Sequence, residues 1–214
     1  MLFDFSSSHD VSLLQSEIEF VQHLFPESAS YVDVYRTHGL LTSKTVLAHG
    51  VHLTDAEIEM CKEAGTSVSH CPSSNFTLCS GTAPIRYFLS KGLTIGLGTD
   101  VSGGPCASMW QAMRETITCS NCVFFNRPDQ KPLNYREACY LGTLGGAKVL
   151  GMEDTVGSFA PGKWFNAQVL NANVEGGPID TYGDAPSDMF QKIFYLCDDR
   201  TIEQVFVKGR KVKG

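Results

Sequence analysis

Short apolar runs that alternate with helical patterns constrain the fold of this chain most strongly. The runs lie near residues 47, 68 and 96. Each is followed by a segment with helical spacing of apolar side chains: 54–65, 82–91 and 108–125. The first segment opens with a capping box, Thr54 with Glu57, and can end at Gly65. Strands that recur in this way are typical of parallel βα units, so the sequence predicts an α/β fold.

The flanking segments suggest two domains. The spacing predicts a further helix over Ser12–Phe25, where Ser12 and Gln15 can form a capping box, and another over Tyr135–Leu150. The C-terminal part has strand patterns at Phe165–Leu170, Ile202–Val207 and Arg210–Val212, and a short helical pattern at Met189–Leu196. We therefore expect a βα domain over residues 1–153 and a β-rich segment over residues 154–214.

Composition narrows the class of partner. The 214 residues are 43% hydrophobic and 19% charged, which is typical of a globular protein, and the formal net charge is −6. An acidic chain has no basic field for a nucleic acid, so we expect a small-molecule partner. No apolar run is long enough for a membrane span, and Met1–Ser8 does not resemble a signal peptide. These features predict a protein of the cytosol.

The eight cysteines are too sparse for a disulfide framework in a chain of this length. We therefore expect reduced, mostly buried thiols. Cys119 and Cys122 form a C-x-x-C pair, but they lie inside the helical segment 108–125 and not at a helix start, where a low-pKa thiolate would form. We interpret this pair as core residues and not as a redox or metal site.

The three predicted strands end in three polar residues: His49, His70 and Asp100. Because the carboxyl ends of parallel strands meet at one edge of a sheet, we expect these side chains to converge there. Two imidazoles and a carboxylate can form a divalent-metal site or a general acid/base pair. Alternatively, each histidine hydrogen-bonds a neighbouring loop and Asp100 caps the turn that Gly103 and Gly104 would allow.

The segments around these residues resemble a known family. The segments 42–50 (TSKTVLAHG), 69–75 (SHCPSSN) and 96–104 (GLGTDVSGG) are similar to the motifs of strands six, seven and eight in the amidohydrolase superfamily, and within it to the guanine deaminases. The segments 143–147 (TLGGA) and 195–200 (YLCDDR) are similar to later parts of those enzymes. The resemblance runs from about residue 18 to the end and covers only the C-terminal half of such an enzyme.

The resemblance implies a fold and an activity. The fold would be the last three or four βα units of a (β/α)8 TIM-type barrel plus strands of a small composite β-sandwich. The activity would be zinc-dependent hydrolysis of guanine to xanthine and ammonia, in purine catabolism, by a homodimer. His49 would contact the metal-bound water or the purine, and Asp100 would bind zinc and transfer a proton. For His70, the same resemblance favours a structural role.

The sequence also departs from the family pattern. The six histidines are residues 9, 23, 38, 49, 52 and 70, so the His-x-His pair of the family is absent. His9 lies near the position of the fifth-strand metal ligand, but Ser12 stands where the catalytic glutamate would follow. A catalytic zinc normally has three protein ligands, and Asp100 alone cannot hold it. We therefore expect that this chain alone does not retain zinc.

These departures leave alternatives open. The chain would be a truncated guanine deaminase-like enzyme, or a catalytically inactive fragment or isoform that associates with a full-length subunit. An open α/β binding domain of the flavodoxin type is disfavoured, because no Gly-rich phosphate loop follows a strand. In an incomplete barrel, we also expect the apolar strands Thr45–Ala48 and Leu93–Leu97 to expose one face to water, with low stability or association as the result.

Overall fold

The computed structural model describes residues 7–11 and 15–214. The chain divides into two compact units, Met1–Met152 and Glu153–Gly214. No helix among the described residues has the length and apolar character needed to cross a membrane.

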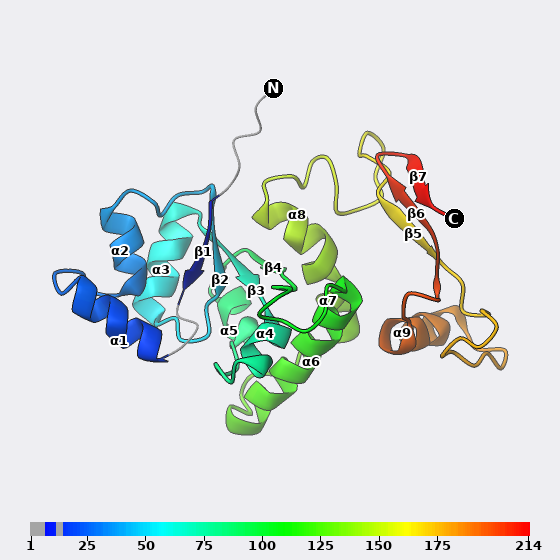
Figure 1. The fold of residues 1–214 in the computed structure, drawn as a ribbon, viewed down its shortest axis with the longest axis horizontal. Coiled ribbons are helices and arrows are strands. Elements are labelled where there is room, and N and C mark those ends of the chain that lie inside the picture. Colours follow the sequence, from blue (N-terminus) through cyan, green and yellow to red (C-terminus); the bar gives the residue numbers. More distant parts are fainter. Residues whose placement is uncertain (1–6, 12–14) are drawn as a thin grey trace. The chain divides into compact units, whose positions relative to one another are not determined.

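A parallel four-stranded sheet forms the centre of the first unit (Figure 1). Its strands are β1 (Ser7–Val11), β2 (Thr45–His49), β3 (Ser67–His70) and β4 (Ile95–Leu97), and they lie side by side in chain order. Every neighbouring pair is parallel. The α/β fold with a parallel sheet that the sequence predicts is therefore confirmed.

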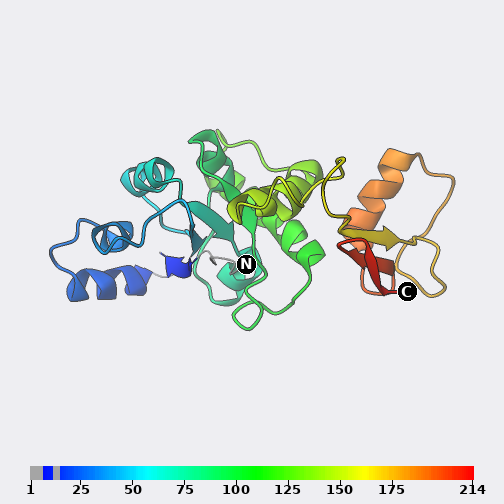
Figure 2. The same cartoon turned by 90° about the horizontal axis from the view of Figure 1, so that it is seen from above.

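Helices fill the connections between the strands. They are α1 (Gln15–Leu24) and α2 (Tyr31–Thr37) before β2, α3 (Asp55–Ala64) before β3, α4 (Pro72–Thr77) and α5 (Ile85–Ser90) before β4, and then α6 (Met109–Asn126), α7 (Tyr135–Tyr140), the π-helical turn η1 (Leu141–Gly145) and α8 (Gly146–Val149). In both views α1, α2 and α3 lie on the β1 side of the sheet, and α6, α7 and α8 lie on the β4 side (Figure 1 and Figure 2).

Local signals account for the helix ends. Thr54 and Glu57 form the predicted capping box of α3, and Gly65 ends that helix with a left-handed φ of 72°. Ser108 caps α6 by accepting a hydrogen bond from the backbone N–H of Gln111. The helix predicted over 82–91 is shorter, because α5 begins only after Pro84.

Several predictions at the N-terminal end were wrong or incomplete. The sequence analysis placed no strand before residue 12, yet β1 pairs with β2 in the register His9 to Leu47. The Ser-Ser-His-Asp run has no apolar alternation to indicate it. The helix expected over Ser12–Phe25 is described from Gln15 onward, and Ser12 lies outside the described residues. Helices α2 and α4 were also missed.

The apolar strands are covered on both faces. Gly96 in β4 faces helix α8, since a Cβ added there would lie 2.9 Å from the Cα of Gly146. Its neighbours Ile95 and Leu97 point to the opposite face and are only 2% and 9% exposed. All five residues of β2 are also buried. The expectation that these strands expose one face to water is therefore wrong.

The second unit contains a three-stranded antiparallel sheet. Its strands are β5 (Ala167–Leu170), β6 (Ile202–Val207) and β7 (Arg210–Lys213), and α9 (Pro186–Leu196) lies in the β5–β6 connection. Lys208 and Gly209, both with positive φ, form the predicted turn between β6 and β7.

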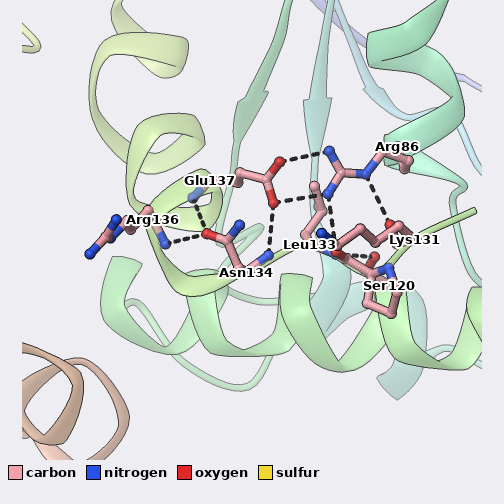
Figure 3. A network of polar contacts seen from close by, with 8 residues as sticks. Arg86, Ser120, Lys131, Leu133, Asn134, Arg136 and Glu137 are labelled. Carbon is pink, nitrogen blue, oxygen red and sulfur yellow. Dashed lines mark hydrogen bonds and ion pairs between the residues drawn. The ribbon is translucent and has the colours of Figure 1, made fainter. Parts of the chain in front are cut away.

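A polar network joins α5 to the start of α7 (Figure 3). The Arg86 guanidinium donates to both carboxylate oxygens of Glu137, at 2.6 and 2.9 Å, and to the carbonyl oxygens of Lys131 and Pro132. Glu137 also accepts from the backbone N–H of Asn134, which caps α7 in return. Arg86 holds the pKa of Glu137 below its usual range, against the opposing effect of burial.

The contact between Gly96 and Gly146 predicts opposite effects of the same substitution. Gly96→Ala forces the new methyl group against backbone atoms of α8. We therefore expect this variant to lower the free energy of unfolding by about 1–3 kcal/mol. Gly146→Ala is the control, because a Cβ there meets only the carbonyl oxygen of Leu141 at 3.6 Å and alanine favours the helix. Urea unfolding measures both. Equal destabilisation by the two variants would contradict this packing.

The Arg86–Glu137 pair predicts a pH-dependent contribution to stability. Because the folded pKa of Glu137 is lowered, its contribution is present above about pH 4.5 and is lost as the pH falls through the folded pKa. We expect Glu137→Gln to cost about 1–2 kcal/mol at pH 7, since both side chains are about one-third exposed. The difference in the free energy of unfolding between Glu137→Gln and wild type should shrink below about pH 4.5.

The control for this prediction is Glu59→Gln, which breaks the more exposed pair of Glu59 and Lys62. We expect that change to stay within about 0.5 kcal/mol at either pH. Denaturant unfolding at pH 7 and pH 4 compares the variants. A Glu137→Gln effect as small as that of Glu59→Gln at pH 7 would show that the network does not stabilise the fold.

Candidate active site

His49 is the last residue of β2 and lies at the carboxyl edge of the sheet. It is 1% exposed, and its φ of 66° is in the left-handed region, which residues other than glycine rarely adopt. Gly50 follows with a φ of 62°. The chain therefore turns sharply where the strand ends. Unusual backbone conformations of this kind cluster at functional sites.

The sequence predicts that Asp100 ends a strand, but the structure places it beyond the end of β4. Strand β4 ends at Leu97, and Asp100 lies three residues further on in a turn, with a φ of 45°. The Asp100 backbone carbonyl accepts a hydrogen bond from Gly104 N–H, which closes the turn. A Cβ at Gly103 would lie 2.7 Å from Asp100 Oδ2, so a glycine leaves room for the carboxylate.

The turn brings Asp100 to His49. Asp100 Oδ2 lies 3.8 Å from His49 Nε2, and the side chain of Asp100 is 37% exposed while that of His49 is 2% exposed. The separation is too long for a direct hydrogen bond, but it leaves both polar groups close enough to contact the same small ligand. A buried imidazole thus faces a carboxylate that water can reach. These groups can bind a polar ligand or exchange a proton with it.

His70, the third predicted residue, lies beside this pair in the interior. It ends β3 and is 0% exposed, and within the described part of the chain neither ring nitrogen has a hydrogen-bond partner. Burial, and secondly the nearby His49, lower the pKa of His70 to about 3. His70 is therefore a neutral imidazole inside the fold at ordinary pH.

Asn75 is a site residue that the sequence analysis did not identify. It lies in α4, which begins directly after β3, and its Oδ1 is 2.9 Å from His49 Nδ1. Asn75 is 1% exposed. The available signal was Pro72, which favours the first position of a helix and so indicates that residues 72–77 are helical and not a loop.

The described side chains do not by themselves fit a zinc ion. Among them, no three histidine, cysteine, aspartate or glutamate side chains lie close enough together to hold a metal. His49 and Asp100 are two donors, whereas a catalytic zinc normally has three protein ligands. His9 is in β1, but its side chain lies outside the described part of the structure.

None of the eight cysteines, all of which lie in the described part of the chain, forms a disulfide. Four are buried, and the others are intermediate or exposed, so the expectation of mostly buried thiols holds for half of them. Cys119 is buried in α6, where burial raises the pKa of its thiol to about 12. The Cys119 side chain is therefore a protonated core thiol at neutral pH.

Comparisons with known proteins support the family resemblance of the sequence motifs. The model of the amidohydrolase family matches residues 11–212. The chain belongs to the amidohydrolase family. It is 44% identical to a guanine deaminase of Dictyostelium discoideum over 200 residues, which are 93% of this chain and 44% of that protein. The chain spans about half the length of the curated relatives it matches.

Solved amidohydrolase-like structures share the fold. A guanine deaminase from C. acetobutylicum, with guanine bound in its active site, has a TM-score of 0.85 and 30% identity over 95% of this chain and 48% of that one. An adenosine deaminase from Xanthomonas campestris, with bound zinc, has a TM-score of 0.82 over 96% of this chain and 45% of that one. Its 22% identity shows the fold alone.

The buried, neutral His70 predicts that acid destabilises the fold. Between about pH 6.5 and pH 3 the unfolded chain binds a proton on this residue that the folded chain does not, so stability falls as the pH falls. Relative to His70→Gln, wild type should lose up to about 1.4 kcal/mol per pH unit in this window. Urea unfolding between pH 6.5 and pH 4.5 measures the slopes.

The control is His23→Gln, because His23 lies on the exposed surface of α1. That variant should keep the wild-type slope. If His70→Gln also keeps it, His70 is protonated in the folded protein and the burial argument fails.

Proposed function

We propose that this chain forms the C-terminal half of the active site of a zinc-dependent guanine deaminase, which converts guanine and water to xanthine and ammonia. One observation carries the proposal: His49 and Asp100 face each other across 3.8 Å at the carboxyl edge of the sheet. The similarity to guanine deaminases supports guanine as the substrate, over another purine or a pterin.

The proposal includes the fold of the whole protein. The four strands β1 to β4 would be the last four of a (β/α)8 barrel, because they are parallel and in chain order. The unit Glu153–Gly214 would contribute its antiparallel strands to a composite β-sandwich. Residues 1–153 and 154–214 would then be the two domains. A homodimer in the cytosol stays a prediction from the sequence and the family.

Each residue has a separate role in this proposal. Asp100 would be one oxygen ligand of zinc and an acceptor for the proton of the attacking water. His49 would bind the purine or that water through Nε2, which points toward Asp100. The described residues supply fewer donors than a zinc site needs. The remaining ligands would have to come from outside the part of the chain that the structure describes.

A second candidate function is association without catalysis. In this case the chain would bind a full-length guanine deaminase subunit and modify its assembly or activity. The observation that favours it is the number of donors, because no three histidine, cysteine, aspartate or glutamate side chains in the described part of the chain could together hold a metal ion. A chain with this incomplete site could keep the fold without the reaction.

Two proteins distinguish the candidates. The first is the 214-residue chain itself, assayed for zinc content and for ammonia release from guanine with added zinc. We expect near-zero zinc and no turnover. The second is a chimera in which this chain replaces the matching half of the Dictyostelium discoideum enzyme. We expect the chimera to deaminate guanine within the usual enzyme range of about 1–10³ s⁻¹. An inactive but folded chimera would favour the second candidate.

Variants of the chimera test the roles of the two residues. Asp100→Asn should lower kcat by at least about 10²-fold and release zinc, because it removes a ligand and a proton acceptor. His49→Ala should lower the rate but leave most of the zinc bound. Asp129→Asn, at an exposed position, is the control and should match the parent. Equal zinc loss in the Asp100 and His49 variants would show that His49 also binds the metal.

A further inference from the structure

Asn75 is fixed firmly in the interior next to the candidate site. Its helix α4 starts two residues after the end of β3, and Pro72 to Asn75 are all buried. The backbone N–H of Asn75 donates to the carbonyl oxygen of Cys71, and its carbonyl oxygen accepts from Ser80 N–H. These bonds hold the backbone of Asn75 in place, and its side chain extends from there to the ring of His49.

The contact between the two side chains determines where the imidazole proton lies. In this orientation of the amide, the carbonyl oxygen Oδ1 of Asn75, which can only accept, lies 2.9 Å from His49 Nδ1, and the contact is a hydrogen bond when Nδ1 carries the hydrogen. In a neutral ring the other nitrogen, Nε2, is then an acceptor. Nε2 is the atom that faces the Asp100 carboxylate at 3.8 Å.

Apart from this contact, the side-chain amide of Asn75 makes no hydrogen bond that the structure describes. Its Nδ2 is buried and has no hydrogen-bond partner among the described residues. A buried amide with an unpaired N–H is unfavourable, and an apolar side chain of similar shape would avoid that penalty. The contact with His49 is thus the one polar interaction of this side chain that the structure describes. This points to a role for Asn75 in orienting His49 and not in stabilising α4.

We infer that Asn75 is a positioning residue that keeps the His49 proton on Nδ1 and thereby turns Nε2 toward Asp100 as a hydrogen-bond acceptor. Nε2 and the carboxylate then form two acceptors about 3.8 Å apart. Such a pair suits a group with two hydrogens to donate, such as a water molecule or the amino group of a purine. This last step rests on the proposed function, whereas the orientation of the ring does not.

The tautomer of His49 can be measured in the 214-residue chain without metal or substrate. Two-bond ¹H–¹⁵N spectra of the ¹⁵N-histidine-labelled protein at alkaline pH distinguish the two neutral tautomers. The His49 signals are assigned by their loss in His49→Gln. We expect the Nδ1–H form to dominate in wild type. Asn75→Ala should reduce the ratio of the Nδ1–H to the Nε2–H form by about tenfold, as loss of one hydrogen bond would.

Two further variants complete the test. Asn75→Asp keeps an acceptor oxygen at the same position, so it should restore the wild-type tautomer. Ser74→Ala is the matched control, since Ser74 is the buried neighbour in α4 and its hydroxyl has no partner in the described part of the chain. It should leave the ratio unchanged. If Asn75→Ala does not fold, the tautomer of the wild-type chain still decides the question, because the inference requires the Nδ1–H form there.

An Nε2–H form in the wild-type chain, or an unchanged ratio in a folded Asn75→Ala variant, would overturn the inference. In the active chimera, Asn75→Ala should lower kcat more than it raises KM, because the ring would be present but wrongly protonated. An inactive chimera together with an Nδ1–H tautomer in the 214-residue chain would contradict the proposed function and leave the positioning role intact. The two ideas therefore fail separately.

Discussion

The parallel pairing of β1 to β4 is the constraint on which the rest of this unit depends. Parallel strands must be joined by crossover segments, so helices necessarily cover the sheet. The same pairing brings the carboxyl ends of β2 and β3 to one edge, and His49 and His70 are therefore neighbours although a helix separates them in the chain. Strand direction thus places the two histidines of the site. Asp100 lies beyond the end of its strand, and the turn closed by the hydrogen bond from Gly104 brings it to His49.

Sequence reasoning succeeded where a local physical signal exists. The capping box at Thr54 marked the start of α3, because side-chain caps are visible in the sequence. It failed for β1, whose residues Ser7–Val11 are mostly polar. That strand forms because its backbone completes the hydrogen bonds of β2, a tertiary effect that no periodicity reports.

The candidate site was predicted in part for the same reason. His49 and Asp100 follow apolar runs, and their residue types suggest metal or acid/base chemistry. The role of Asn75 depends on its distance to His49, which a sequence does not contain. The burial of β2 and β4 was also mispredicted, since the apolar runs were correct but the covering of their second face depends on packing across the unit. Sequence patterns therefore identify helices and strands. The contacts between those elements decide which side chains are buried and which lie close enough to act together.

A functional site at the carboxyl edge of the sheet would explain why unpartnered polar groups are buried there. His70, Ser74 and Asn75 all have buried polar atoms without partners among the described residues, which is unfavourable for stability alone and common at functional sites. The most direct test of this account is a crystal structure of the 214-residue chain. We expect the Asp100 carboxylate to face His49 Nε2 at about 3.8 Å, with Nδ1 bonded to Asn75. An Asp100 side chain turned to solvent, with the His49 ring bonded elsewhere, would contradict it.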